Sequence, residues 1–375
     1  MPRLPQGVSK RKDGLYQKRF TVEGKRYSVY GRSTKELIDK ELEKRKEIES
    51  GLNQSKTNVT LNKYFQEFIN QKQGYVKPTT IYKYQSVYNA RIKQALGNKH
   101  LKAIDKAFLL SFRDGMIKNE VSYEYINYVF VVLKSVFTNA VADEIILKNP
   151  LQGIKPLKSE KKEASETIHR ALTEEEQKEF MEYLRNEKEW LYELFALMLN
   201  TGMRCSEALA LTWSDIDYIN NVIHVDKTLT VNASGQVVVG TPKTAKSKRD
   251  IPMNDNIRQI LKSQRKKYNL LAEIEEVSIN HVFISTRGNI VDKRTVGKHL
   301  ERCIKKMNEQ GFTIEKFTSH ALRDTFATRF IEQGGTPQTL KAILGHSSLS
   351  MTMDLYAHVL PNTKAEEMNK IIIAI

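Results

Sequence analysis

Apolar residues recur every three or four positions between residues 59 and 155, which is the spacing of helices that bury one face. The pattern is clear in residues 61–69 and 81–92, and a longer apolar stretch covers residues 125–142. Two pairs that disfavour helix interrupt it, Pro78-Thr79 and Gly97-Asn98. We therefore expect a small helical bundle in this part of the chain.

The segment from His169 onward mixes helical spacing with the alternation that is typical of strands. Alternation occurs in residues 222–231, 236–241 and 248–253, around turns at 232–235 and 244–247. Helices are expected to open at Leu172-Thr173 and to cover residues 190–199, 256–268, 292–310, 321–332 and 337–344. The pattern predicts a mixed domain of helices and small sheets.

The amino-terminal residues also alternate. Residues 15–22 and 27–30 are typical of strands joined by a turn at Glu23-Gly24. Thr34 is a suitable N-cap for a helix that runs to about Ser50. We expect a hairpin followed by one helix.

Polar stretches divide the chain. One covers residues 51–58, and a second, charged and poor in apolar residues, covers 155–167. A length of 375 residues suits two or three domains. The expected domains are residues 1–54, 59–155 and 169–375, with a linker at 156–168.

The chain carries 60 Lys and Arg against 44 Asp and Glu, so its formal net charge is +16. Hydrophobic residues make up 40% and charged residues 28%, which is the composition of a globular protein. A positive surplus of this size favours a polyanionic partner. Nucleic acid is expected ahead of an anionic membrane surface.

The sequence does not show the features of several other classes of protein. No apolar run approaches the ~20 residues of a membrane span, and the polar, basic start does not resemble a secretory signal. No phosphate loop of the GxxxxGK[ST] type occurs. Cys205 and Cys303 make neither a disulfide framework nor a zinc site, and they fit a reducing cytoplasm. We expect a cytoplasmic protein with no membrane partner.

Half of the positive surplus lies in residues 1–35, where ten Lys and Arg accompany two acids. Such a run can be no more than a solvated face. Here aromatic residues are interleaved with the bases, and a small basic sheet can lie in a DNA groove and pair its cations with phosphates. The expected DNA contacts are Lys10, Arg11, Lys12, Lys18, Arg19, Lys25 and Arg26.

Arg204 is the first candidate for a phosphate site. It follows Thr201-Gly202-Met203 between two apolar helices, and Ser206 can cap the second helix. Arg204 is therefore expected near a helix start, where backbone N–H groups favour an anion. Taken alone, a surface arginine is the more common explanation.

His320 and Arg323 are the second candidate. They are three residues apart, so both side chains are expected on one side of a helix. Leu322, Phe326 and Phe330 would then form the buried face of that helix. His and Arg are both donors that can hold a phosphate, although a hydrogen-bonded His on a polar face would give the same pattern.

The end of the chain offers two more polar residues. Thr336 and Pro337 suit a helix start, and Gly345 suits the residue just past its end, so His346 is expected in a defined turn. Tyr356 follows ten residues later. Alone, it would be one of sixteen tyrosines, most often a core or interface aromatic.

Four segments in a fixed order carry a resemblance to a known family. They are TGMRCSEALAL, HALRDTFATRF, LGHSS and DLYAHV. Their order of Arg, His-x-x-Arg, His and Tyr resembles the catalytic domain of the tyrosine recombinases, also called the phage integrase family. More loosely, the whole chain is similar to integrases of temperate phages and conjugative transposons.

The resemblance implies a role for each matching residue. Tyr356 would be the nucleophile, and Arg204 and Arg323 would clamp the phosphate. His320 and His346 would be the two histidines of the set.

Two further roles follow from the resemblance. Glu207 would support the site without attacking the DNA. The family lysine lies in a β-hairpin turn, and here it would be Lys243, with Lys246 as the alternative.

The implied fold is multidomain and mainly α with small β-sheets. It has an amino-terminal three-stranded sheet plus helix for arm-type DNA sites, a helical-bundle, SAM-like core-binding domain, and a mixed α+β catalytic domain with a carboxy-terminal tail. The implied enzyme is a site-specific integrase that cuts and rejoins DNA through a covalent 3′-phosphotyrosine, so that a mobile element is integrated and excised.

The resemblance also implies the partners. The enzyme would act as a homotetramer on double-stranded DNA, at core-type and arm-type sites, with no metal, ATP or other cofactor. DNA-bending and excision proteins are the accessory partners that it allows.

Three other functions fit the sequence less well. A metal-dependent nuclease or transposase needs clustered carboxylates, and Asp215 and Asp217 are the nearest candidates, although they are more typical of a turn after a helix. A DNA-binding regulator with a decayed site is disfavoured because all six family positions are filled. A topoisomerase-like relative would share the chemistry, but the basic amino-terminal block favours recombination between paired sites.

Overall fold

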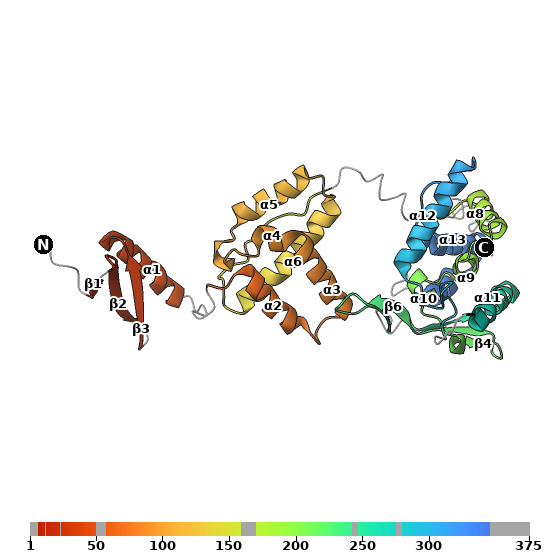
Figure 1. Cartoon of the computed structure of the whole chain (residues 1–375), viewed down its shortest axis with the longest axis horizontal. Coiled ribbons are helices and arrows are strands. Elements are labelled where there is room, and N and C mark those ends of the chain that lie inside the picture. The colour runs from red at the N-terminus through yellow and green to blue at the C-terminus, as the bar shows by residue number, and fades with distance from the viewer. Residues whose placement is uncertain are drawn as a thin grey trace, which may run out of the picture. The chain divides into compact units, whose positions relative to one another are not determined.

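The structure is a computed structural model, and it describes residues 7–11, 13–22, 24–49, 58–158, 170–241, 247–274 and 280–345 (Figure 1). Backbone contacts divide the chain into two units, Met1–Ser159 and Glu160–Ile375. Buried hydrophobic residues form separate clusters in the amino-terminal sheet, the helical bundle and the carboxy-terminal unit. The expected fold class, mainly helical with small antiparallel sheets, is confirmed.

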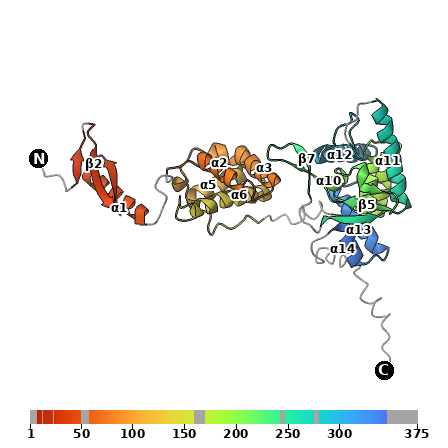
Figure 2. The same cartoon turned by 90° about the horizontal axis from the view of Figure 1, so that it is seen from below.

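A three-stranded antiparallel sheet and one helix form the amino-terminal part. Strands β1 (Val8–Lys10), β2 (Tyr16–Val22) and β3 (Lys25–Gly31) pair in chain order. Helix α1 (Thr34–Glu49) lies along one face of this sheet (Figure 2), where Phe20, Val29 and Leu37 are buried. The sequence pattern predicted β2 and β3, whereas the three residues of β1 are too few to show alternation.

The cap of α1 differs from the prediction by one position. The Glu36 amide donates to Ser33 Oγ at 3.2 Å, and the Arg32 amide donates to Glu36 Oε2 at 2.7 Å. Thr34 is the first helical residue. Ser and Thr are both good N-caps, so the sequence alone could not choose between two adjacent candidates.

The helical bundle contains five α-helices among the described residues: α2 (Leu61–Lys72), α3 (Pro78–Val87), α4 (Lys93–Leu96), α5 (Lys106–Lys118) and α6 (Tyr123–Ala142). Two short turns, η1 (Tyr88–Ile92) and η2 (Leu101–Ala103), complete it. The side chains of Thr60, Asp105 and Ser122 each accept an amide hydrogen bond at the start of a helix. These caps and the apolar spacing explain why the bundle was predictable.

The turn η1 is π-helical, where the sequence predicted a continuous α-helix. The Tyr88 ring stacks on Phe65 with 3.6 Å between the ring centroids, and its hydroxyl donates to Asn62 Oδ1 at 2.7 Å. Tyr88 and Ile92 are both buried. The wider π turn is the local adjustment that puts both residues in the core.

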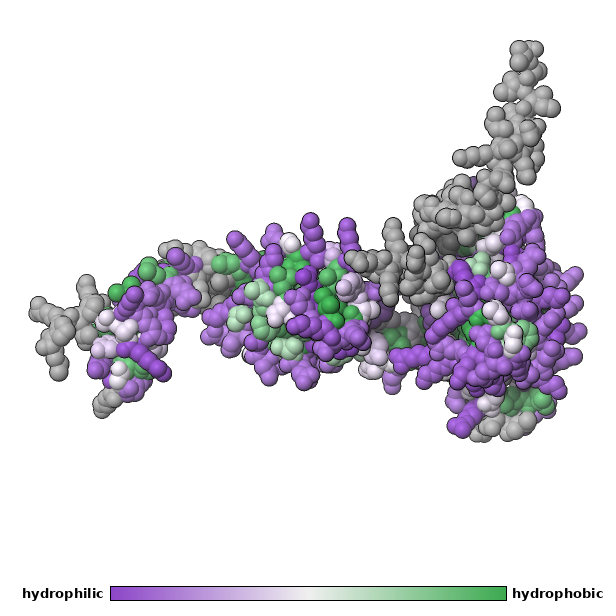
Figure 3. Space-filling model, turned by 90° about the horizontal axis from the view of Figure 1, so that it is seen from above, coloured by the Kyte–Doolittle hydropathy of each residue, from purple (hydrophilic) through white to green (hydrophobic). Residues whose placement is uncertain are grey.

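Helix α6 corrects one expectation, because its length and composition would suffice to cross a membrane. One such helix is weak support for a span, since the core helix of a globular protein passes the same test. Seven of its side chains lie in the bundle core: Ile126, Val129, Val132, Leu133, Val136, Phe137 and Ala140. On the face seen in Figure 3 the described residues are mainly hydrophilic, with smaller hydrophobic areas. We interpret α6 as the central helix of the bundle.

The carboxy-terminal unit combines helices with two small sheets. Its helical elements are α8 (Glu174–Asn186), α9 (Tyr192–Thr201), α10 (Cys205–Ala208), η4 (Trp213–Asp215), α11 (Asp255–Ile274), α12 (Lys293–Glu309), α13 (Ser319–Glu332) and α14 (Pro337–Leu344). Strands β4 (Ile216–Asp217), β5 (Val222–Val225) and β8 (Arg249–Pro252) form one antiparallel sheet, with β5 in the middle. Strands β6 (Thr228–Val231) and β7 (Val237–Gly240) form a separate hairpin.

The single strand predicted over residues 222–231 is wrong, because the segment divides into β5 and β6, which belong to different sheets. Asp226 and Lys227 lie between them, and Lys227 Nζ binds Asp215 Oδ1 at 2.7 Å. Alternation continues across the break, so the pattern could not reveal it.

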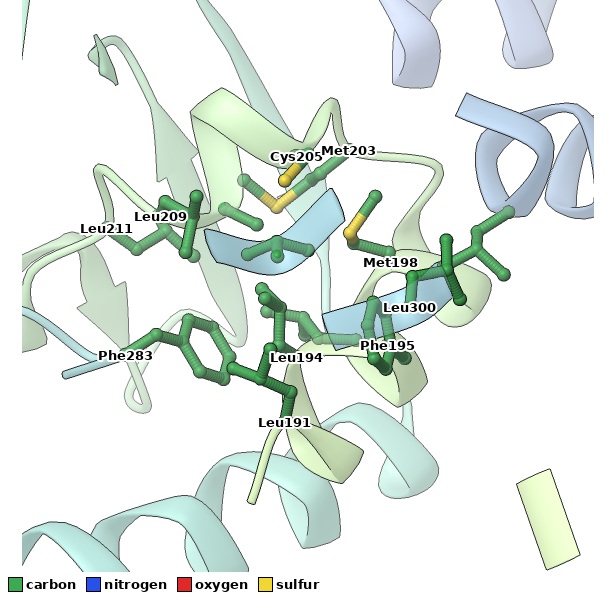
Figure 4. Close-up of a cluster of buried hydrophobic side chains, with 14 of the residues drawn as sticks. Leu191, Leu194, Phe195, Met198, Met203, Cys205, Leu209, Leu211, Phe283 and Leu300 are labelled. Atoms are coloured by element: carbon green, nitrogen blue, oxygen red, sulfur yellow. The ribbon is translucent and has the colours of Figure 1, made fainter. Parts of the chain in front are cut away.

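Helix α9 lies at the centre of this unit. Leu194, Phe195, Leu197 and Met198 are fully buried, and Figure 4 shows several of them among core side chains that include Met203 and Leu300. Backbone contacts join α9 to both α11 and α13. The end of α9 and the start of α10 are therefore held by the core of the unit.

Candidate functional site

The site is built around the turn that joins α9 to α10. Gly202 ends α9 with φ +63°, a left-handed conformation that glycine adopts most easily. A Cβ at this position would lie 2.4 Å from Phe326 Cδ1 and 2.6 Å from Leu344 Cδ2. The turn therefore packs closely against α13 and against the end of α14.

Arg204 immediately precedes α10, as the sequence predicted. Ser206 is not its cap, because Ser206 lies inside the helix and the Arg204 amide donates to Glu207 Oε2 at 3.0 Å. Arg204 Nη1 donates to Glu207 Oε1 at 2.8 Å, while 40% of the Arg204 side chain stays exposed. A carboxylate thus orients this guanidinium and leaves part of it open to solvent.

Arg323 is buried on α13, with 2% of its surface exposed. Its Nη1 donates to Gly202 O and its Nη2 to Leu344 O, both at 2.8 Å. Burial lowers the pKa of Arg323 to about 9, with a further contribution from the positive charge of Arg204, so it remains charged at neutral pH. Arg323 joins the α9–α10 turn to the end of α14.

Glu207 is the shared partner of two arginines. Its side chain is 4% exposed, and its Oε2 also accepts from Arg249 Nη2 at 2.9 Å. Burial alone would raise the pKa of Glu207, but the hydrogen bond and charge of Arg249, together with Arg204, hold the pKa below its ordinary value. Glu207 therefore stays ionised in the folded protein.

Arg249, at the start of β8, was missed by the sequence analysis. It lies in a Lys-rich segment and showed no distinguishing pattern, yet its side chain is 5% exposed and bound to Glu207. Only the packing of β8 against α14 shows its position.

His320 lies at the amino-terminal end of α13, whose cap is Thr318. Its Nδ1 lies 3.1 Å from Asp324 Oδ2, one helical turn further on, and 47% of its side chain is exposed. Leu322 is fully buried, while Phe326 and Phe330 are partly buried in a small cluster with α14. The helix thus exposes His320 and buries Arg323.

The remaining predicted residues of this site lie outside the described part of the chain: Lys243, Lys246, His346 and Tyr356. The described chain reaches the residue before His346. There Gly345 ends α14 with φ +65°, and Thr336 and Pro337 begin that helix as predicted. The backbone that leads to His346 is thus next to Arg323 and Arg249.

The amino-terminal sheet separates the predicted DNA contacts by face. Directly opposed residues of an antiparallel pair point to the same side, and Arg19 lies opposite Ser28 while Thr21 lies opposite Arg26. Arg19 and Arg26 are exposed on this side, which we call the open face because α1 packs on the other.

Other predicted contacts differ in their surroundings. The Arg11 guanidinium lies 5.2 Å from the ring centroid of Tyr30, whose pairing with Gln17 places it on the open face. Lys18 lies on the α1 side and binds Glu41, which makes it the least suited to a phosphate. Lys10 lies 5.5 Å from the Tyr16 ring centroid. Lys12 and the Lys25 side chain are outside the described residues.

The carboxylates considered for a metal site have other partners. Asp215 accepts from the Thr212 amide at 2.8 Å and binds Lys227, and Asp217 accepts from the amides of Ile219 and Asn220. Asp215 ends the short helix η4 and Asp217 ends strand β4, so the expected turn after a helix is only approximate, and both carboxylates are used to hold this local structure.

Glu189, His299 and Cys303 form a group in the described residues whose ligand atoms are close enough for a metal. Trp190 Nε1 donates to His299 Nδ1 at 3.2 Å, so the ring proton belongs on Nε2, which faces Glu189 Oε2 at 3.3 Å. A protonated Nε2 cannot bind a metal, and we interpret the group as a buried histidine beside a carboxylate and a thiol.

Profiles of two protein domains match this chain. The profile of the phage integrase family matches residues 170–363, and that of the phage integrase N-terminal SAM-like domain matches residues 60–117. The tyrosine recombinase XerC-like protein of Caldanaerobacter subterraneus is 29% identical over 93% of this chain and 92% of its own length. The transposase from transposon Tn916 of Enterococcus faecalis is 26% identical over 98% of this chain and 94% of its own length.

Solved structures of integrases are also similar to this chain. The Tn1549 transposon integrase in complex with transposon right end DNA has a TM-score of 0.68 and 26% identity, covering 84% of this chain and 99% of that chain. A lambda integrase tetramer bound to a Holliday junction has a TM-score of 0.61 at 21% identity, covering 92% of this chain and 96% of that chain, which is a likeness of fold.

The buried arginine network on this fold, together with these matches, defines an enzyme that cuts and rejoins DNA strands. The chain belongs to the phage integrase family and is a tyrosine recombinase of the integrase type.

Proposed function

We propose that this protein is the integrase of a conjugative transposon or a related mobile element, and that it cuts and rejoins DNA through a 3′-phosphotyrosine at Tyr356. One observation carries the assignment of the site. Arg204, Glu207 and Arg323 meet at the Gly202 turn, and Arg323 also binds the end of α14, which leads toward His346 and Tyr356. Relatives of similar length include transposon transposases, which supports the choice of element.

In this proposal the arginines stabilise the phosphate in the transition state. A guanidinium offers a planar fork of donors that stays charged at physiological pH. Arg204 is oriented by Glu207 and partly exposed, so it can reach a non-bridging oxygen. Arg323 carries a desolvated charge with N–H groups beyond the two that bind carbonyls, and a buried donor of this kind stabilises developing negative charge more strongly than it would in water.

The remaining residues would move protons. The phenol of Tyr356 has an ordinary pKa of about 10, so it needs a base or nearby cations to attack at neutral pH. His320, exposed at the start of α13, is the proposed proton acceptor, with its Nδ1 held by Asp324. Lys243, or alternatively Lys246, would protonate the departing 5′ oxygen, and His346 would donate to the same phosphate.

The covalent intermediate would conserve the energy of the broken phosphodiester. A 5′-hydroxyl of another strand can then attack the phosphotyrosine and reseal the DNA. The proposed reaction therefore needs neither ATP nor a metal ion.

The proposed domains each have a DNA-related role. Residues 1–54 would bind arm-type sites through the open face, residues 59–155 would be the core-binding domain, 156–168 the linker, and 169–375 the catalytic domain with its tail. The SAM-like match at residues 60–117 and the surplus of positive charge support this division.

The assembly is proposed by analogy. A relative of the same fold, lambda integrase, is a tetramer on a Holliday junction, and we propose a homotetramer on DNA here, with DNA-bending and excision proteins as accessory partners. The tail after residue 361 would dock either on its own catalytic domain or on a neighbouring subunit, and only the second would couple the active sites. Action on the DNA of a bacterial host would place the enzyme in the cytoplasm.

A nicked-substrate assay tests the function and the nucleophile together. The full chain is incubated in EDTA with a nicked duplex carrying the ends of its element, and the products are separated on a denaturing gel. We expect a protein–DNA adduct for the wild type and none for Tyr356→Phe. An adduct that persists in Tyr356→Phe would assign the attack to another residue, and cleavage abolished by EDTA would favour a metal-dependent nuclease.

A further inference from the structure

Arg249 uses all three guanidinium nitrogens inside the protein. Its Nε donates to Ile343 O, its Nη1 to Ser247 O at 3.2 Å, and its Nη2 to Glu207 Oε2 at 2.9 Å. The side chain is 5% exposed. Arg204 is partly exposed, whereas all three guanidinium nitrogens of Arg249 bind protein atoms and its side chain is buried.

The three acceptors belong to three different segments. Glu207 is on α10, Ser247 precedes β8, and Ile343 is in the last turn of α14. Each segment borders a proposed catalytic residue: Arg204, the hairpin lysine and His346. One guanidinium therefore connects the three places from which the site is assembled.

Two arginines bind the carboxy-terminal end of α14. Arg249 binds Ile343 O and Arg323 binds Leu344 O, so two successive carbonyls that a helix end leaves without partners are both satisfied by arginines. Gly345 follows directly, and a Cβ there would lie 3.1 Å from Arg249 Cδ. The direction in which the chain leaves α14 is thus fixed against the Arg249 side chain.

Glu207 connects Arg249 to Arg204. Its Oε2 accepts from Arg249 and from the Arg204 amide, while its Oε1 accepts from Arg204 Nη1. Removing Arg249 would leave a buried carboxylate whose remaining partner is Arg204. That would pull the Arg204 guanidinium toward the protein and away from a phosphate.

We propose that Arg249 is a positioning residue for DNA cleavage: it holds the Arg204–Glu207 pair and the exit of α14 in register without touching DNA. This inference rests on the proposed function of the Arg204–Arg323 site. A lysine could not replace Arg249, because a single ammonium cannot reach three acceptors that lie in different directions around a planar fork.

The test compares Arg249→Lys with Arg170→Lys. Arg170 is a matched control, since it makes a bidentate ion pair with Glu176 at 2.6 Å in the same unit and contacts none of the site residues. Both full-length variants are assayed for DNA affinity, melting temperature and single-turnover adduct formation on the nicked duplex, well below both melting temperatures.

A positioning role predicts a specific result. Arg249→Lys should form the adduct at least about tenfold more slowly, because small displacements of catalytic groups cost one to two orders of magnitude in rate. Its DNA affinity should stay near that of the wild type. Arg170→Lys should have a lower melting temperature than the wild type but should form the adduct at the wild-type rate. Equal rates for the two variants, or a loss confined to DNA affinity, would overturn the proposal.

A second variant covers the case in which Arg249→Lys fails to fold. Glu207→Gln retains the shape of the side chain, and it should slow adduct formation too. A double variant that combines Arg249→Lys and Glu207→Gln should form the adduct no more slowly than the slower single variant, because both changes act through the Arg204–Glu207 pair. If the rate of the double variant falls by the product of the two single losses, the shared mechanism is contradicted. Tyr356→Phe tests the proposed function separately. If Tyr356→Phe forms no adduct, the proposed function stands whether or not Arg249 is a positioning residue.

Discussion

Two arginines with the same proposed task lie in opposite surroundings. Arg204 is partly exposed and bound to a carboxylate, whereas Arg323 is buried and bound to two carbonyls. A desolvated charge without a carboxylate partner of its own is costly in the free protein. An incoming phosphate would offset that cost, because it would provide the negative charge that the buried guanidinium lacks.

Glu207 should make folding stability depend on pH. Because its pKa is lower in the folded protein than the ordinary 4.5, its contribution is complete above pH 4.5 and is lost as the pH falls through the folded-state pKa. Glu207→Gln should cost about 3–5 kcal/mol at pH 7, as expected for breaking a buried ion pair, and less below pH 4. Urea unfolding of both proteins at the two pH values measures the difference.

The control for this prediction is Glu174→Gln, at an exposed position in the first turn of α8. Its effect on unfolding should be small at both pH values. A cost for Glu207→Gln that is equal at pH 7 and below pH 4 would show that ionisation of Glu207 does not stabilise the fold.

At the scale of elements, the α9–α10 turn depends on a glycine. Gly202→Ala would place a Cβ 2.4 Å from Phe326 and force an alanine to φ +63°. We expect a loss of about 2–4 kcal/mol in unfolding free energy, from backbone strain and overpacking together. Adduct formation should fall as well, because Gly202 O holds Arg323.

Gly297→Ala is the matched control for the turn. Gly297 lies inside α12, and a Cβ there would meet nothing within 4 Å. Alanine should stabilise the helix by up to about 1 kcal/mol. Thermal unfolding should therefore shift in opposite directions for the two variants, and a shift of the same sign would contradict the structural explanation.

The amino-terminal sheet makes a prediction about its two faces. Replacing Arg19 and Arg26 with alanine should weaken binding of the full chain to element-end DNA and lower the salt dependence by about one ion per contact. Lys18→Ala should change neither, because Lys18 binds Glu41 on the α1 side. Titrations at several salt concentrations measure both quantities, and a larger effect of Lys18→Ala would mean that DNA approaches the other face.

At the scale of the whole molecule, the domain division predicts separable activities. Deleting residues 1–54 should leave adduct formation on core-site DNA intact, because the proposed catalytic residues all lie beyond residue 200. Recombination between element ends that carry arm-type sites should fall strongly. A recombination assay with supercoiled substrates checks this, and unchanged recombination would remove the proposed role of the amino-terminal domain.

The sequence determined most of the elements because their signals are local. Apolar spacing located the bundle helices, Thr336, Pro337 and Gly345 marked the ends of α14, and four short segments identified the family. Such signals depend on neighbours within a few positions. They failed where two candidates were adjacent, as at Ser33 and Thr34, or where a break left the alternation unchanged, as between β5 and β6.

Only the tertiary structure decided how the site is held together. Arg249 and Ile343 are far apart in the sequence, and so are Arg323 and Gly202; nothing local distinguishes a buried arginine from an exposed one. The face on which Lys18 or Arg19 lies likewise depends on where α1 packs. Burial and long-range hydrogen bonds arise from the packing of distant segments, and for that reason the residue that positions the others appears only in the folded chain.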